Sequence, residues 1–310
     1  MAVLSGNAVS HNKVVSHNRV VLSIQSHVVF GYAGNTAAVF PLQRLGREVW
    51  AINTVEFSNH TGYGSWRGKV LGAELAAELV AGLEERGVLG RCEAVLSGYL
   101  GDAACGRAII DAVKKVKREN PDALYCCDPV MGDTDRGFYV KPDIPAMFRD
   151  ELLPLADIVC PNQFELEALT GVSINTVNDA VRAVNTLHEK GVSIALVTSF
   201  REEEGRLGMI ASDKTNCFKI TTPELPLGYG VAGTGDMTSA IFLSRYLETK
   251  DIEKTLELCA ASVFGILEAS YRTSVSSDMK NNHHFELKII DAQKELDSPS
   301  HYFKAEKIYT

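Results

Sequence analysis

The sequence lacks several features that would each assign the chain to a well-defined class of protein. No uncharged apolar run approaches the length of about 18–20 residues that a membrane-spanning helix needs, so a transmembrane protein is excluded. Lys and Arg are not in excess: 31 of them stand against 39 Asp and Glu, a formal net charge of −8. This acidic balance argues against a protein that coats nucleic acid or anionic lipid.

Metal-binding and disulfide patterns are also missing. The seven cysteines are an odd number, no pair is spaced Cys-x-x-Cys, and most lie in apolar stretches. This usage is typical of reduced thiols in a cytoplasmic protein. No His-Glu-x-x-His or Cys/His finger spacing occurs, so a structural zinc site is not expected.

Two common nucleotide-binding motifs are absent as well. Gly68-Lys69 is followed by Val70 rather than by Ser or Thr, and no Gly-x-x-x-x-Gly-Lys-Ser/Thr sequence occurs elsewhere, which excludes a P-loop NTPase. A Gly-x-Gly-x-x-Gly sequence does not follow the first expected strand, so dinucleotide binding is not favoured.

What is present is the composition of a globular protein, with 310 residues, 45% of them hydrophobic and 23% charged. Residues 10–15 and 16–21 form a near-duplicate pair without an apolar core, and we expect residues 1–18 to be a flexible extension. From residue 19 to 310 we expect a single α/β domain, because short β-branched runs alternate with amphipathic stretches. The expected strands are 20–24, 49–53, 94–97, 124–127, 157–160 and 194–198, then a hairpin of 207–212 with 217–222; helices are expected over 72–85, 103–118, 178–190 and from 234 to the end.

This alternation predicts a mostly parallel central sheet with helices on both faces. Ligands of such sheets bind beyond the carboxyl ends of the strands. Polar residues collect at these predicted ends, and we expect them to face one cleft: Ser26-His27, Ser58 to Thr61, Gly98-Tyr99, Asp128-Pro129, Pro161-Asn162 and Thr198-Ser199.

The sequence Gly233-Thr234-Gly235-Asp236 directly precedes a helical run. Glycines let the backbone approach a ligand closely, and the free N–H groups of a helix N-terminus favour an anion. An anion cradle beside an ionised Asp236 suits phosphoryl transfer, with the carboxylate taking the proton of an attacking hydroxyl. A glycine-rich helix start with an acidic first turn is also common without function.

A second group is acidic. Asp128 and Asp133 bracket a loop after a buried strand, and Glu165 lies three residues beyond Asn162. Carboxylates around a phosphate site are suitable ligands for Mg²⁺, which takes one or two of them and keeps several waters. Asn162 or Glu165 alone could equally cap a helix or a turn.

Six motifs in one order make the chain similar to pyridoxal kinases of the ribokinase-like superfamily. They are Ser23 to Asn35 (SIQSHVVFGYAGN), Phe57 to Tyr63 (FSNHTGY), Leu96 to Tyr99 (LSGY), Cys127 to Asp133 (CDPVMGD), Pro161 to Glu165 (PNQFE) and Gly233 to Asp236 (GTGD). The resemblance covers residue 20 to near the C-terminus. It implies a three-layer ribokinase-like fold and transfer of the γ-phosphoryl of ATP to the 5′-hydroxyl of pyridoxal. It also implies Mg²⁺, commonly a monovalent cation such as K⁺, and a homodimer.

The resemblance also implies residue roles. Asp236 matches the catalytic base, with Gly233, Thr234 and Gly235 at the anion hole. Ser26 and Thr61 match residues that bind the polar atoms of the pyridine ring, and Tyr99 matches one that packs on its face. The full expected substrate site is Ser26, Val55, Phe57, Thr61, Gly62, Tyr99 and Cys127. The expected ATP site is Asp128, Cys160, Asn162, Glu165, Thr198, Ser199 and Val231, and the expected Mg²⁺ ligands are Asp128, Asp133 and Glu165.

Some positions need separate treatment. On an alternating strand Cys126 and Cys127 point to opposite faces, so Cys127 could face the cleft and add reversibly to the pyridoxal aldehyde. Cys160 and Val231-Ala232 depart from the family pattern beside the expected K⁺ site. The short loop Thr134–Tyr139 is expected to form a small flap over the nucleotide.

Two alternatives stay open. A hydroxymethylpyrimidine kinase would share the fold and the Asp-Pro-Val-Met and Pro-Asn motifs. A non-catalytic protein that binds vitamin B6 compounds could have kept the kinase scaffold, although a binding protein does not need Asp236 as a base.

Overall fold

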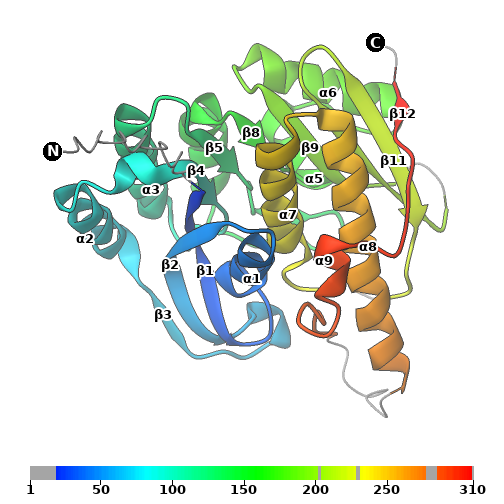
Figure 1. Ribbon diagram of the computed structural model, residues 1–310, viewed down its shortest axis with the longest axis horizontal. Helices are drawn as coiled ribbons and strands as arrows, with labels where there is room; N and C mark the ends of the chain where they lie inside the picture. Colours follow the sequence, from blue (N-terminus) through cyan, green and yellow to red (C-terminus); the bar gives the residue numbers. More distant parts are fainter. Residues whose placement is uncertain (1–18, 202–203, 228–230, 277–284, 309–310) are drawn as a thin grey trace, which may run out of the picture.

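One mixed sheet organises the part of the chain that the computed structural model describes, residues 19–201, 204–227, 231–276 and 285–308. Its ten strands lie in the order β12-β11-β10-β9-β8-β5-β4-β1-β2-β3 (Figure 1). The strands from β2 to β9 pair parallel, and β3 at one edge and β10, β11 and β12 at the other pair antiparallel. The expected α/β fold with a mostly parallel centre is confirmed.

The strands are β1 (Val20–Phe30), β2 (Glu48–Asn59), β3 (Gly68–Val70), β4 (Cys92–Ser97), β5 (Leu124–Cys127), β6 (Gly132–Asp133), β7 (Gly137–Phe138), β8 (Ile158–Val159), β9 (Ile194–Phe200), β10 (Arg206–Ser212), β11 (Cys217–Pro223) and β12 (Glu306–Lys307). The α-helices are α1 (Asn35–Arg44), α2 (Gly72–Glu85), α3 (Ala103–Glu119), α4 (Ile144–Ala146), α5 (Gln163–Thr170), α6 (Val177–Glu189), α7 (Thr234–Thr249), α8 (Ile252–Ser276) and α9 (Lys294–Asp297). Short 3₁₀ helices are η1 (Thr61–Tyr63), η2 (Leu89–Arg91) and η4 (Leu153–Leu155), and η3 (Met147–Leu152) is a short π-helix.

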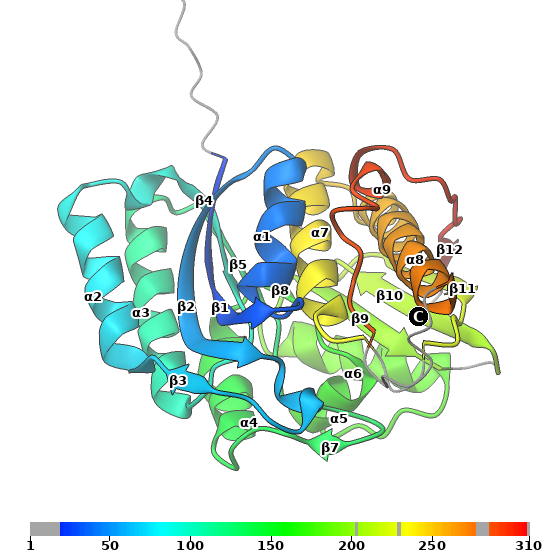
Figure 2. The same ribbon diagram turned by 90° about the horizontal axis from the view of Figure 1, so that it is seen from below.

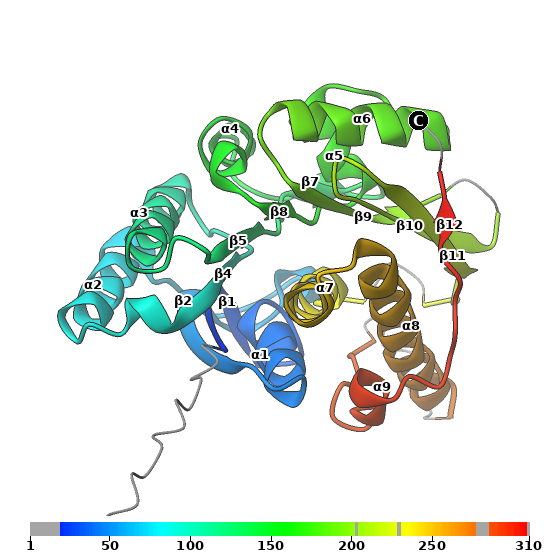
Figure 3. The same cartoon turned by 45° about the horizontal axis from the view of Figure 1, so that its top comes forward.

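Helices cover both faces of the sheet, as expected (Figure 3). Helices α2 to α6 lie on one face, where an apolar cluster includes Tyr125 and Cys127; α1, α7, α8 and α9 lie on the other, where a second cluster includes Cys126. Neighbouring strand residues alternate between the two clusters because successive side chains of a strand point to opposite faces. The prediction that Cys126 and Cys127 point to opposite faces is therefore confirmed.

Strands β1 and β2 are longer than predicted. They pair in register through Val28–Phe57 and Phe30–Asn59, with an irregularity between Gln25 and His27. Polar residues within both segments interrupt the apolar run, and this is why the sequence pattern ended each strand early. The extra residues continue past the end of β4 and, with β3, form a short three-stranded projection of the sheet (Figure 2).

The expectation of helices from residue 234 to the end is wrong beyond α8. Residues 285–308 contain only the four-residue α9, and Glu306–Lys307 add to the sheet edge beside Phe218 and Lys219 of β11. The expected extension over residues 1–18 lies outside the described residues. Within the described part of the chain, no helix is both long enough and apolar enough to cross a bilayer.

Candidate active site

Helix α7 begins where the sequence placed it. Gly233 is the residue before the helix and has φ 80°, and a Cβ there would lie 2.4 Å from the carbonyl oxygen of Tyr32. Only glycine permits both this left-handed backbone and this approach. The Thr234 hydroxyl donates to the Val231 carbonyl oxygen at 2.8 Å and closes the preceding turn. Gly235 is exposed, and a Cβ there would have only Asp128 Oδ2 within 4.0 Å.

Asp236 is half-buried in the first turn of α7. Its Oδ2 accepts a hydrogen bond of 2.8 Å from the N–H of Gly34, which lies in the loop between β1 and α1. Burial raises the pKa of Asp236, and the N–H groups of Gly34 and of Asp236 itself oppose the rise. A carboxylate held in place with a raised pKa is a suitable proton acceptor.

The loop that holds Asp236 also lies against Ser26. Gly34 has φ 56°, and a Cβ there would lie 2.1 Å from the Ser26 carbonyl oxygen and 2.3 Å from its Oγ. Ser26 is 8% exposed. Ser26, Gly34 and Asp236 are therefore neighbours, although Gly34 had no predicted role. The signal that could have revealed it is a glycine between a strand and a helix.

Two further carboxylates, Asp128 and Glu165, are buried near Asp236. The Oδ2 atom of Asp128 accepts a 2.8 Å hydrogen bond from the Ser239 hydroxyl, which lies one turn after Asp236 on α7. Burial, and then the charges of Glu165 and Asp236, raise the pKa of Asp128 well above its usual value. The predicted carboxylates Glu165 and Asp236 are therefore close enough to Asp128 for their charges to affect its ionisation.

Glu165 is held by backbone groups on both carboxylate oxygens. Oε1 accepts from the N–H of Met131 at 2.9 Å and Oε2 from that of Asn162 at 3.0 Å, while Asn162 accepts in return from Glu165 N–H. This reciprocal pair is the capping box of α5. Burial raises the pKa of Glu165 to about 8, against the opposing backbone hydrogen bonds. The helix-capping role that the sequence left open is thus present for both residues.

Asp133 does not form a shared set of metal ligands with the buried carboxylates Asp128 and Glu165. Its Oδ2 accepts from Nε of Arg136 at 2.8 Å, and the guanidinium of Arg136 lies 5.0 Å from the ring centroid of Tyr139. Among the described residues, no group of three or more His, Cys, Asp or Glu side chains is arranged to hold a metal ion. The predicted loop Thr134–Tyr139 is the turn and second strand of the small hairpin of β6 and β7.

The expected nucleotide residues divide into two kinds. Asn162 and Thr198 form a parallel bridge at the strand ends; the exposed Ser199 follows with φ 56°, a strained conformation for a residue with a side chain. Cys160, by contrast, is 3% exposed and its Sγ lies 3.8 Å from Cys126 Sγ in the apolar core. The thiol of Cys160 is therefore packed in the core, and its expected role at the ATP site stays a prediction. Val231 is partly buried against the same core cluster.

The expected substrate residues also separate. Val55 and Phe57 pack with Val28 and Ala33 in a small apolar cluster, against which Tyr99 is partly buried. Thr61 and Gly62 are exposed on the turn η1.

Cys127 is 1% exposed within the core cluster, and burial raises the pKa of its thiol to about 12. Helices cover the face to which Cys127 points, which does not favour reaction of its thiol with the aldehyde; its place in the substrate site stays a prediction. A buried protonated thiol is also a poor nucleophile toward an aldehyde.

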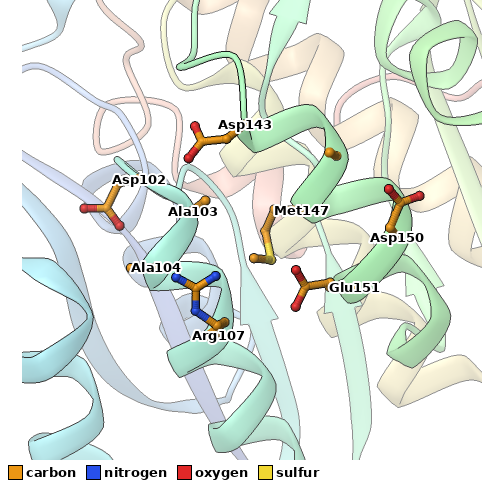
Figure 4. A pocket seen from close by; sticks show the side chains of 9 residues that line it. Asp102, Ala103, Ala104, Arg107, Asp143, Met147, Asp150 and Glu151 are labelled. Carbon is orange, nitrogen blue, oxygen red and sulfur yellow. The ribbon is translucent and has the colours of Figure 1, made fainter.

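A separate open pocket of about 390 Å³ lies between the N-terminus of α3 and the segment from α4 to η3 (Figure 4). Its lining residues are Asp102, Ala103, Ala104, Arg107, Asp143, Ala146, Met147, Asp150 and Glu151. None of them is a predicted site residue, and the Asp102 carboxylate is engaged in capping α3 through the N–H of Cys105.

Comparisons with known proteins give the family. A family model described as phosphomethylpyrimidine kinase matches residues 68–279. Pyridoxal kinase PdxY of Rubrobacter xylanophilus is 48% identical over 292 residues, which cover 93% of this chain and 97% of that protein. PdxY of Granulibacter bethesdensis is 48% identical over 293 residues, covering 92% and 99%. The chain belongs to the pyridoxal kinase family.

Solved pyridoxal kinases share the fold. The enzyme of Leishmania donovani in complex with ADP and pyridoxamine has a TM-score of 0.87 at 29% identity, covering 94% of this chain and all of that one (100%). Pyridoxal kinase from Trypanosoma brucei has a TM-score of 0.81 at 30% identity, covering 94% and 99%. The pyridoxal kinase relatives also account for nearly the whole chain, whereas the phosphomethylpyrimidine kinase model omits the segment that carries Ser26 and Thr61. The pyridoxal kinase family is therefore the more specific assignment.

Proposed function

We infer that the chain transfers the γ-phosphoryl group of ATP to the 5′-hydroxyl of pyridoxal and gives pyridoxal 5′-phosphate. The observation that carries this function is the position of Asp236, which lies in the first turn of α7 and is hydrogen-bonded at 2.8 Å to the loop beside Ser26. Asp236 would therefore act as a base between the N-terminus of α7, which favours an anion, and the end of the cleft that binds the substrate. Family membership supports the same reaction.

The chemistry follows from these groups. Asp236 accepts the proton of the 5′-hydroxyl as its oxygen attacks the γ-phosphorus, and the bond from that phosphorus to the β,γ-bridging oxygen breaks. N–H groups of the first turn of α7, which lack intrahelical partners, stabilise the charge on the transferred oxygens. Gly233 and Gly235 keep this approach clear of side chains. Mutual positioning and charge stabilisation supply most of the catalysis in phosphoryl transfer.

The substrate ring fits the small cluster of Val55, Phe57 and Tyr99. A flat heterocycle with polar edges needs an aromatic platform and a few directional hydrogen bonds. Tyr99 supplies the platform, and Ser26 and Thr61 supply hydroxyl groups at the ring edge. Thr61 and Gly62 lie on η1 and are exposed, so they would contact the ring from the solvent side of the site.

Asp128 is the residue best suited to hold Mg²⁺ with ATP. It is 3% exposed, and its pKa is raised by burial and by two neighbouring carboxylates, an arrangement that a bound cation would stabilise. Asp133 and Glu165 would act from farther away through water, since their oxygens accept hydrogen bonds from protein groups. When bound, Mg²⁺ neutralises charge on the phosphates. Asn162, Thr198 and Ser199 would line the nucleotide side.

Two further properties implied by the family are proposals for this chain. A K⁺ site near residue 160 would have to use backbone oxygens, because the Cys160 thiol is buried; equal activity in KCl and NaCl would count against it. A homodimer is supported by exposed apolar side chains on β1 and around β3, which are Val29, Phe30, Trp66 and Val70.

The decisive experiment is an assay of the full chain with ATP and Mg²⁺. Pyridoxal, pyridoxine and hydroxymethylpyrimidine are compared, with products identified by mass. Asp236→Asn is expected to lower kcat for pyridoxal by about 10²–10⁴-fold and to leave its KM nearly unchanged. Asp122→Asn, on an exposed turn, is the control and should behave as the unmodified chain.

Each alternative gives a different result. A preference for hydroxymethylpyrimidine would transfer the chain to that activity. Binding of pyridoxal without turnover would favour the non-catalytic protein. Unchanged kcat in Asp236→Asn would remove the proposed base, and a matched rise in KM would make Asp236 a ground-state anchor for the hydroxyl.

A further inference from the structure

Glu286 connects two substrate-side segments that are far from it in the sequence. It follows α8 and is half-buried. Its Oε2 accepts a 3.1 Å hydrogen bond from the N–H of Tyr32, in the loop between β1 and α1. Its Oε1 accepts a hydrogen bond from the hydroxyl of Tyr63, the last residue of η1.

The neighbouring loop is built to admit this carboxylate. Gly31 has φ 82°, and a Cβ on Gly31 would lie 2.4 Å from Oε2 of Glu286. Burial and Glu286 raise the pKa of Tyr63 far above its usual range, so its hydroxyl stays protonated and can donate. The ring of Tyr63 also packs edge-to-face on Phe30, with centroids 6.0 Å apart. Tyr63 is therefore fixed at both its ring and its hydroxyl.

Both segments that Glu286 joins carry groups of the proposed site. The turn η1 contains Thr61 and Gly62, and the β1–α1 loop continues to Gly34, whose N–H donates to Asp236. Because Thr61 and Gly62 are exposed, core packing does not fix their distance from Asp236. The hydrogen bonds of Glu286 instead connect Tyr63 of η1 to the backbone of Tyr32 in the β1–α1 loop.

We propose that Glu286 is a positioning residue that fixes η1 against the β1–α1 loop and so sets the substrate end of the cleft for pyridoxal. This role rests on the proposed kinase function. Glu286 does not contact the reacting atoms; it acts through Tyr63 and the Tyr32 backbone. Without it, η1 loses a charged hydrogen-bond acceptor, and Thr61 must be ordered by the substrate itself.

Loss of the Glu286 carboxylate should change the KM for pyridoxal but not the KM for ATP. Loss of a hydrogen bond to a charged group should weaken pyridoxal binding and raise the pyridoxal KM on the order of tenfold in Glu286→Ala. The KM for ATP should stay within about twofold, because the nucleotide residues lie on other strand ends. Glu286→Gln keeps a neutral acceptor and should recover part of the loss.

The test uses steady-state kinetics of the full chain for both substrates. Glu286→Ala, Tyr63→Phe and the double variant form a double-mutant cycle, and the exposed Glu306→Gln is the matched control. Tyr63→Phe keeps the ring on Phe30, so it tests the hydrogen bond if Glu286→Ala folds poorly. We expect the pyridoxal KM of the double variant to be no higher than that of the worse single variant.

Two results would overturn the proposal. One is a pyridoxal KM within about twofold of the unmodified chain in both single variants. The other is effects that multiply in the double variant, which would mean that the two residues act independently. An unmodified chain that does not phosphorylate pyridoxal would instead refute the proposed function, so the two failures are distinguishable.

Discussion

Asp128 and Glu165 are carboxylates whose burial works against ionisation. Both pKa values are raised first by burial, and the charges of nearby carboxylates add to the effect. Such groups are a cost to the folded chain at neutral pH unless a cation or a proton compensates them. At the scale of single residues, these carboxylates should therefore make the stability of the folded chain depend on pH.

The raised pKa of Glu165 predicts the direction in which the stability of the folded chain changes with pH. Below its ordinary pKa of 4.5 the carboxyl is protonated in both the folded and the unfolded chain; up to about 8 the folded chain holds a proton that the unfolded chain has lost. Stability must then fall as the pH rises through this window. We expect the Tm of the chain without nucleotide to decrease from pH 5.5 to 8.

The comparison variant is Glu165→Gln, which cannot titrate and should show a shallower decrease, whatever its absolute Tm. Glu306→Gln, on an exposed edge strand, should keep the original slope. A Tm that rises over this pH range, or equal slopes for all three proteins, would contradict the assignment of the raised pKa to Glu165.

Residue types at the site were predictable, but their exposure was not. Asp236, Asp128 and Glu165 could be proposed from glycines, strand ends and spacing alone. The alternation of a strand tells which face a cysteine points to, but it does not tell what covers that face. Cys127 and Cys160, which the sequence placed among the candidate site residues, are 1% and 3% exposed.

At the scale of elements, the β1–α1 loop matters because it is shared. Within four residues it donates to Glu286 through Tyr32 and to Asp236 through Gly34. The strands that lead into the cleft were predictable where they are apolar and buried, as β5 was. The outer halves of β1 and β2 were not, since polar residues interrupt the apolar run in each and the two segments pair with each other past the end of β4.

A substitution in this loop tests its role. Gly34→Ala would place a Cβ 2.1 Å from a backbone oxygen, at φ 56°. The loop must move, which would pull the Gly34 N–H away from Asp236. We expect a loss of about 1–3 kcal/mol of stability and at least about a tenfold lower kcat.

The control is Gly87→Ala at the end of α2, where φ is 66° and nothing lies within 4 Å of the added Cβ. It carries a similar backbone strain without the collision, so it should cost stability but not kcat. Measured by thermal unfolding and steady-state kinetics, a Gly34→Ala enzyme as active as Gly87→Ala would show that the loop does not position Asp236.

At the scale of the whole molecule, contacts between residues distant in the sequence determine parts of the structure that local sequence patterns do not predict. The contact between Glu286 and Tyr32 spans 254 residues, and β12 exists only because residues 306–307 meet β11. Periodicity within residues 285–308 carries no trace of either. The overall α/β architecture was predictable because the alternation of strands and helices repeats along most of the chain.

The outer surface of the projection formed by β1, β2 and β3 is where the proposed dimer would form. Val29 is 75% exposed and Phe30 59%, and Trp66 and Val70 are exposed on or beside β3 of the same projection. Exposed large apolar side chains can mark an interface, and association with a second copy would bury some of them. The same projection carries η1, so a partner there would lie close to the substrate entrance.

Light scattering after size-exclusion chromatography measures the mass directly. We expect about twice the chain mass of 33.8 kDa for the unmodified protein and a shift toward the monomer in Val29→Asp, because a buried unpaired charge is costly. Tyr302→Asp is the control: Tyr302 is 74% exposed, but it lies in the C-terminal segment away from this edge. A monomeric unmodified chain would refute the dimer. A dimer that Val29→Asp leaves intact would instead place the interface on another surface.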